Sequence, residues 1–332
     1  MDNTSKNNFS YRIYGLNIRT SEPLCGFEQS EPNASVNLDV QFASPTEQEP
    51  PTHQQWIPAV VAKNRQKPRI HIERAGDALR IQYHTRFIGN VCSIINAESD
   101  FVWLQFEKGV SQQEKASFFT GTVLGSILRR RGRLCLHAGS VVINGKAALI
   151  VGQQGAGKST TTAALLRYAG ANLIADDVAV IDYIDNVPHV LPGYAGMRLN
   201  PDAITPVLKQ DSAGLPQVFS TREKRLVSLS AVSEFSTRIS IEPVPIGAIY
   251  VLVNIEGNGI FANDIPRLSS LLTLTENTYC NYAVIDKWQV EHEFLEINRL
   301  IETTPIRRIR RHCGFELLPA LCNAIVNELS AA

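Results

Sequence analysis

The feature that most constrains this chain is a loop of glycine, four further residues and Gly-Lys-Ser at positions 152–159, GQQGAGKS. An apolar run of buried-strand type, 146–151, precedes the loop, and an Ala- and Leu-rich segment of helical character, 160–168, follows it. Strand, glycine-rich loop and helix in this order predict a phosphate-binding loop.

The residue types of this loop suit a nucleotide triphosphate. Glycines let the backbone turn consecutive N–H groups toward phosphate oxygens, and the helix that begins near Lys158 adds the positive end of its dipole. We expect Lys158 to reach the β- and γ-phosphates and the Ser159 hydroxyl to ligate Mg²⁺. The predicted nucleotide-binding residues are Gly152, Gln153, Gln154, Gly155, Ala156, Gly157, Lys158, Ser159 and Thr160.

Two adjacent carboxylates, Asp176 and Asp177, follow an apolar run at 172–175, one helix and one strand after the loop. Ligands bind at the carboxyl ends of the strands in a parallel α/β sheet, so the pair is expected beside the phosphates. One carboxylate can hold Mg²⁺ while the other accepts a proton from an attacking hydroxyl. We assign Asp176 as the base and Asp177, with Ser159, as the metal ligand. The roles can also be exchanged, because adjacent carboxylates titrate as a coupled unit.

Two further residues are candidates for the same site. His137 lies in an apolar stretch that continues to an Asn144-Gly145 turn, the strongest short signal for a hairpin. The chain should therefore double back and carry His137 toward the nucleotide, although a hydrogen-bonded core histidine is the alternative. Arg198, in a glycine-bearing loop after the Asp pair, can meet a phosphate or form a surface salt bridge. The candidate catalytic residues are Asp176, His137, Lys158 and Arg198.

In their order and spacing, His137, the loop ending in Lys158 and Ser159, and the Asp pair resemble the catalytic domain of the HPr serine kinase/phosphorylase family. The string RGRLCLHA at 131–138 is more similar to the shorter HPr-kinase-like proteins, which include lasso peptide kinases that phosphorylate a precursor peptide on serine. A looser likeness extends to residues 11–16. The resemblance implies a P-loop kinase domain with a mixed sheet and flanking helices, with ATP and Mg²⁺ as cofactors.

The resemblance also implies a partner, a small protein or ribosomal peptide that carries an acceptor serine. The Glu-x-Arg-Gly segment tied to dephosphorylation in the bifunctional enzymes has no clear counterpart, the nearest being 196–199. A serine kinase is therefore favoured over HPr kinase/phosphorylase. A non-catalytic nucleotide-gated binding protein and a plain ATP hydrolase stay open as alternatives.

The composition excludes some classes of binding partner for this protein. The chain has 332 residues with 32 acidic and 32 basic side chains and no net charge, which argues against nucleic acid or an anionic membrane. No apolar run approaches the roughly 18 residues that span a bilayer, and the polar first ten residues do not resemble a signal peptide. We expect a cytoplasmic protein, and a homo-oligomer is compatible with the sequence.

The pattern of elements predicts an α/β chain in two domains, a β-rich N-terminal domain at 1–110 and an HPr-kinase-like P-loop domain at 111–332. The expected strands are 11–18, 36–42, 70–73, 78–83, 101–106, a buried strand 246–253 and an arginine-rich edge strand 306–311. The expected helices are 111–129, with a capping box from Ser111 to Glu114, and 264–279, 290–302 and 315–329. The charged run 222–225 is expected to be solvated or to cover the site.

Overall fold

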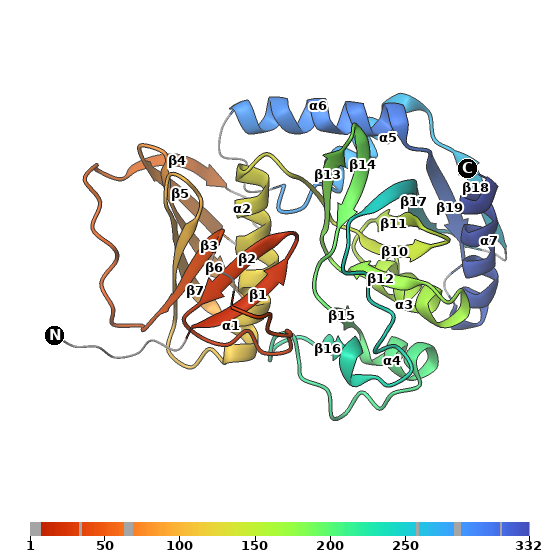
Figure 1. Ribbon diagram of the computed structural model, residues 1–332, viewed down its shortest axis with the longest axis horizontal. Helices are drawn as coiled ribbons and strands as arrows, with labels where there is room; N and C mark the ends of the chain where they lie inside the picture. The colour runs from red at the N-terminus through yellow and green to blue at the C-terminus, as the bar shows by residue number, and fades with distance from the viewer. Residues whose placement is uncertain are drawn as a thin grey trace.

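Two β-sheets organise the computed structural model, which describes residues 8–32, 35–62, 69–256, 259–281, 287–312 and 314–331. The N-terminal sheet, red to orange in Figure 1, lies to one side of a yellow helical segment, and the second sheet, green to blue, lies to the other. The fold is a mixed α/β fold with helices on both faces of the second sheet.

The N-terminal sheet has the strand order β1-β2-β3-β8-β7-β6-β5-β4. Its strands are β1 (Phe9–Ile13), β2 (Leu16–Thr20), β3 (Leu38–Ala43), β4 (Ile57–Ala62), β5 (Arg69–Ala75), β6 (Ala78–Thr85), β7 (Gly89–Ile95) and β8 (Phe101–Phe106). The single strand predicted at 11–18 is wrong, because Tyr14 and Gly15 form a turn that splits it into β1 and β2. The prediction also missed β7 and β4; β4 contains Pro58 and lies at the sheet edge, where a missing N–H is tolerated.

A helical segment packs on this sheet. It consists of α1 (Gln112–Phe118), a π-helical turn η1 (Phe119–Val123) and α2 (Leu124–Arg130). The capping box predicted at Ser111 and Glu114 is confirmed, and so is the helix predicted at 111–129, which continues through the π-helical turn η1 to Arg130. One hydrophobic cluster joins the N-terminal sheet, this segment and residues of the second sheet such as Ala175 and Val180. The two halves of the chain therefore share a core.

The second sheet has the order β12-β10-β11-β17-β14-β13-β9, and β19 lies between β17 and β18. Parallel pairs (β11 with β17, β17 with β19) coexist with antiparallel ones, so the sheet is mixed. The predicted hairpin is confirmed, since Asn144 and Gly145 both have positive φ between β10 and β11. Its strands are β9 (Leu134–Leu136), β10 (Gly139–Ile143), β11 (Lys146–Gly152), β12 (Asn172–Ala175), β13 (Ala179–Ile184), β14 (Val187–Leu191), β17 (Val244–Asn254), β18 (Ile260–Asp264) and β19 (Ile306–Arg311).

Helices cover this sheet on both faces (Figure 1). The helices α3 (Lys158–Tyr168), α4 (Pro201–Leu208) and α7 (Leu318–Ala331) share one hydrophobic cluster, and α5 (Arg267–Glu276) and α6 (Lys287–Thr303) share another. A short ribbon of β15 (Gly196–Leu199) and β16 (Arg225–Ser228) packs beside α3. The 3-10 turns are η2 (Leu229–Ala231) and η3 (Phe315–Leu317).

Two predicted elements near the C-terminus need correction. The helix predicted from residue 264 begins only at Arg267, because 260–264 pair with β19 as a strand. The predicted edge strand is wrong, since β19 lies inside the sheet between β17 and β18. Its arginines find partners there: Arg307 pairs with Glu328 of α7, and Arg311 is buried at 4% exposure.

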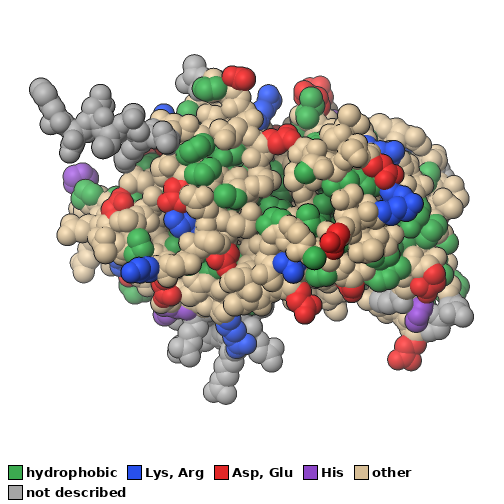
Figure 2. Space-filling view, turned by 90° about the horizontal axis from the view of Figure 1, so that it is seen from below, with side chains coloured by type: hydrophobic (Ala, Val, Ile, Leu, Met, Phe, Trp, Pro, Cys, Tyr) green, Lys and Arg blue, Asp and Glu red, His purple; other side chains and the backbone are tan. Residues whose placement is uncertain are grey.

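The surface carries charges of both signs. Figure 2 shows one face on which acidic and basic side chains are interspersed, in keeping with the zero net charge. Among the residues that the structure describes, no helix combines the length and the apolar character that crossing a membrane requires.

Candidate active site

A pocket of about 1320 Å³ lies where β11 and β12 end. The structure brings together there most of the residues singled out from the sequence: the glycine-rich loop, His137, Asp176, Asp177 and Arg198 all line the pocket. Ala156, which also belongs to the loop, is buried and does not line the pocket. The predicted residues come from segments that lie up to about sixty positions apart, and residues from 222–224, 276–281 and 311–318 complete the lining.

Two glycines of the loop have no room for a side chain. Gly152 has φ 149°, and a Cβ there would lie 2.8 Å from the carbonyl oxygen of Leu252. Gly157 has φ 85°, and a Cβ there would lie 2.3 Å from Nη2 of Arg311. Gly157 is also the N-cap of α3 and supplies no capping side chain, so first-turn N–H groups are left for an anionic ligand.

Lys158 folds back on the loop in the protein alone. Its Nζ donates to the carbonyl oxygens of Gly152 at 2.8 Å and Gln153 at 3.3 Å. Burial lowers the pKa of Lys158 to about 8, against the opposing charges of Asp177 and Asp176. A phosphate group in the loop would offer this ammonium a stronger, charged acceptor than the two carbonyls.

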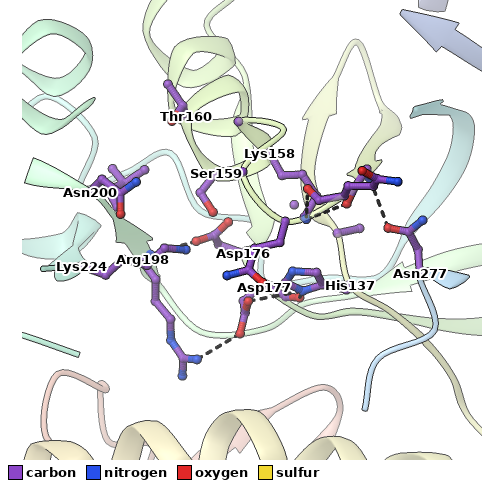
Figure 3. A pocket seen from close by; sticks show the side chains of 18 of the residues that line it. His137, Lys158, Ser159, Thr160, Asp176, Asp177, Arg198, Asn200, Lys224 and Asn277 are labelled. Carbon is purple, nitrogen blue, oxygen red and sulfur yellow. Dashed lines mark hydrogen bonds and ion pairs between the residues drawn. The ribbon is translucent and has the colours of Figure 1, made fainter. Parts of the chain in front are cut away.

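Asp176 is buried at 1% exposure, and its carboxylate is directed toward Ser159 (Figure 3). Its Oδ2 accepts a hydrogen bond from the backbone N–H of Arg198 at 2.8 Å. Its Oδ1 has no hydrogen-bond partner within the described residues. Burial raises the pKa of this carboxyl, whereas the Arg198 N–H and the nearby Ser159 hydroxyl oppose the rise.

Asp177 points the other way. Its Oδ2 accepts from Nη1 of Arg198 at 3.0 Å and from the Tyr279 hydroxyl at 3.3 Å, and its Oδ1 lies 3.4 Å from Nδ1 of His137 (Figure 3). Burial raises the pKa of Asp177, but Arg198 and His137 outweigh it and hold the pKa below its usual value. The adjacent carboxylates therefore occupy different electrostatic environments.

The Arg198 guanidinium forms a salt bridge with Asp177 and does not extend into the pocket as a free cation. Besides Asp177, its guanidinium donates through Nη2 to the Ser117 carbonyl oxygen at 3.0 Å and to the Thr120 hydroxyl at 3.3 Å. Of the two roles considered for Arg198, the geometry supports the salt bridge, although a buried and not a surface one.

Several residues of the site were missed by sequence reasoning. The side-chain oxygen of Asn277 accepts from the N–H of Gly152 at 3.3 Å, and its backbone oxygen accepts from the N–H of His137 at 2.7 Å. Arg311, in the strand predicted to lie at the sheet edge, donates from Nη2 to the Ala156 carbonyl oxygen at 3.0 Å. More than a hundred positions of sequence separate the two residues of each hydrogen bond, and no local sequence pattern predicts contacts of this kind.

The charged run at 222–225 reaches the pocket. Arg222, Glu223 and Lys224 line it, and the Arg222 guanidinium lies 3.7 Å from the centre of the Phe87 ring. This segment thus adds positive charge near the Asp pair.

No protein-family model matches the sequence, and no curated protein matches it. A solved structure that is similar to the chain is the Hpr(Ser) kinase/phosphatase from Coxiella burnetii, at 15% sequence identity and a TM-score of 0.31. The match covers 59% of this chain and 96% of that chain. At such a TM-score the likeness decides neither the fold nor the function of this protein.

Proposed function

We propose that the protein is a kinase that binds ATP with Mg²⁺ at its glycine-rich loop and transfers the γ-phosphate to a serine hydroxyl of a small protein or precursor peptide. The observation that carries this proposal is the divergence of the two carboxylates, with Asp176 directed to Ser159 and Asp177 to His137. Phosphoryl transfer needs positioning and charge neutralisation on both sides of the transferred group, and two separate carboxylates can serve the two sides.

The Asp176 side fits a divalent cation. A buried carboxylate oxygen without a partner is costly, and a cation between Oδ1 and the Ser159 hydroxyl would satisfy it. Mg²⁺ typically takes one or two protein ligands and completes its shell with phosphate oxygens and water. When bound, the ion would neutralise charge on the β- and γ-phosphates. We therefore favour the exchanged assignment, with Asp176 and not Asp177 as the metal ligand.

The Asp177 side fits the acceptor. Arg198 keeps this carboxylate ionised, so it can accept the proton of an attacking hydroxyl. His137 donates through Nδ1 to the backbone oxygen of Asp177 at 2.9 Å, which holds its ring beside this carboxylate. Lys224, which lines the same pocket, would add positive charge for the transferred phosphate.

The far end of the pocket fits a nucleobase. Leu199, Phe315 and Leu318 line it, and η3 packs against α4, which follows Leu199. The Phe315 ring is 39% exposed, and exposed aromatic rings in a pocket stack on the faces of bases. We place the adenine there, against Phe315.

Replacing Phe315 with Ala is expected to weaken ATP binding about tenfold, because one stacked face is lost. Inorganic tripolyphosphate has no base, so its affinity should be unchanged. Titration calorimetry with both ligands measures the difference. Phe261→Ala, which removes another exposed ring from the edge strand β18, is the matched control. Equal losses for ATP and tripolyphosphate would place the base elsewhere.

The kinase itself is tested by incubating the protein with ATP, Mg²⁺ and serine-bearing acceptors, namely HPr and candidate precursor peptides, and weighing the acceptors by mass spectrometry. A gain of one phosphate on a serine, absent without Mg²⁺, is the expected result. If ATP binds but no acceptor in the panel gains phosphate, the kinase proposal fails for these acceptors and a nucleotide-gated binding protein accounts better for the pocket.

A further inference from the structure

The turn between β1 and β2 is strained. Tyr14 has φ 52° and Gly15 has φ 74°, the left-handed pair that a two-residue hairpin turn requires. Glycine, asparagine and aspartate adopt this backbone readily, whereas a bulky aromatic residue does so only when its surroundings hold it there. The contacts of Tyr14 with the rest of the chain hold it in this conformation.

Tyr14 inserts into the second half of the chain. Its side chain is buried at 2% exposure, its hydroxyl donates to the Val178 carbonyl oxygen at 3.0 Å, and its N–H donates to the Pro192 carbonyl oxygen at 2.8 Å. Gly193 leaves room for the ring, because a Cβ there would lie 3.1 Å from Cε1 of Tyr14. Tyr14 is thus fixed at both its backbone and its hydroxyl.

The residue before Val178 is Asp177, which is itself left-handed with φ 75°. The Tyr14 hydroxyl therefore holds the carbonyl of the residue that follows a second left-handed residue, and that residue, Asp177, presents its carboxylate to Arg198 and His137. A shift of Val178 away from Tyr14 would also move the adjoining backbone of Asp177, from which the carboxylate projects.

The helical segment that packs on the N-terminal sheet also contributes to the position of this carboxylate, through its contacts with Arg198. Nη2 of Arg198 donates to the Ser117 carbonyl oxygen and to Thr120 in η1, while Nη1 holds Asp177. Gly121 in η1 makes this approach possible, because a Cβ there would lie 3.3 Å from Nη1 of Arg198. Isolated π-helical turns are often found at functional sites, and Thr120 of this one contacts the arginine that holds Asp177.

We infer that Tyr14 is a positioning residue for phosphoryl transfer, because its hydroxyl fixes the Val178 carbonyl and thereby the left-handed backbone that aims the Asp177 carboxylate. The N-terminal sheet is then a structural part of the transfer site and not an appended module. This inference rests on the proposed kinase function.

The test is Tyr14→Phe, which keeps the ring and the packing and removes only the hydroxyl. Tyr11→Phe is the matched control, since the Tyr11 hydroxyl accepts from the Leu24 N–H within the N-terminal sheet and does not touch the Asp pair. Hydrogen exchange of peptides that span 176–180 is expected to speed up about fivefold in Tyr14→Phe and not in Tyr11→Phe. This readout does not depend on any catalytic activity.

The second readout is the rate of γ-phosphate release from radiolabelled MgATP, with water as the acceptor, together with ATP affinity from calorimetry. Tyr14→Phe should slow release about fivefold while ATP affinity stays within about twofold. Equal exchange and equal release in the two variants would overturn the inference. So would an ATP affinity that falls as much as the rate. If the wild-type protein neither releases nor transfers phosphate, the proposed function fails, while the exchange comparison still decides whether Tyr14 holds the Asp177 backbone.

Discussion

Replacing Lys158 with Ala is expected to slow phosphoryl transfer at least about a hundredfold, because a preorganised charge aimed at the transferring group is lost. ATP affinity should fall about tenfold or more, since a charge-assisted hydrogen bond to phosphate disappears. The rate is measured as phosphate transfer to an acceptor or to water, and the affinity by calorimetry.

The same side chain predicts a pH dependence. Lys158 has a pKa of about 8 in the protein alone, and phosphate charges would favour its protonated form. Below about pH 7 the lysine is already charged and nucleotide binding takes up no proton through it; between about pH 8 and 9 binding should take one up and weaken as pH rises. Calorimetry in two buffers of different ionisation enthalpy measures the uptake, which Lys158→Ala should lose.

Lys146→Ala is the matched control, because Lys146 is an exposed lysine at the start of β11, the strand that leads into the loop. It should leave the rate, the affinity and the proton uptake unchanged. A Lys158→Ala rate within about tenfold of wild type would mean that this lysine does not stabilise the transferring phosphate.

The parts of the site that could be predicted from the sequence are the local ones. The loop at 152–159 lies in one strand-turn-helix unit, and the Asn144-Gly145 turn brings His137 back beside it. In both cases the residue types themselves dictate the backbone, because glycine and asparagine are the residues that adopt left-handed conformations with ease.

The parts that could not be predicted depend on packing between distant segments. Tyr14 and Asn277 reach the site from opposite ends of the chain; the looser likeness over 11–16 assigns Tyr14 no contact, and Asn277 lies in no motif. The alternating arginines of β19 were interpreted as a solvated edge because alternation reports which residues share a face, and not whether acidic partners cover that face. Glu328 of α7 supplies one of those partners.

Changing each carboxylate of the Asp pair to the amide should separate the two roles. Asp177→Asn is expected to slow transfer at least about a hundredfold, because the proton acceptor is lost, while MgATP affinity stays within about threefold. Asparagine tolerates the left-handed backbone of Asp177, so the fold of the loop should survive. Transfer rates and calorimetric affinities are measured for both variants under the same conditions.

Asp176→Asn is expected to act on the metal instead. The amide keeps an oxygen for the Arg198 N–H but removes the charge beside Ser159, so the gain in ATP affinity on adding Mg²⁺ should shrink about tenfold or more. The two variants are each other's controls, since they remove the same charge from neighbouring positions. If Asp177→Asn loses the Mg²⁺ dependence and Asp176→Asn keeps it, Asp177 is the metal ligand after all. In that case the free Oδ1 of Asp176 faces the acceptor hydroxyl, and Arg198 holds a metal ligand in place.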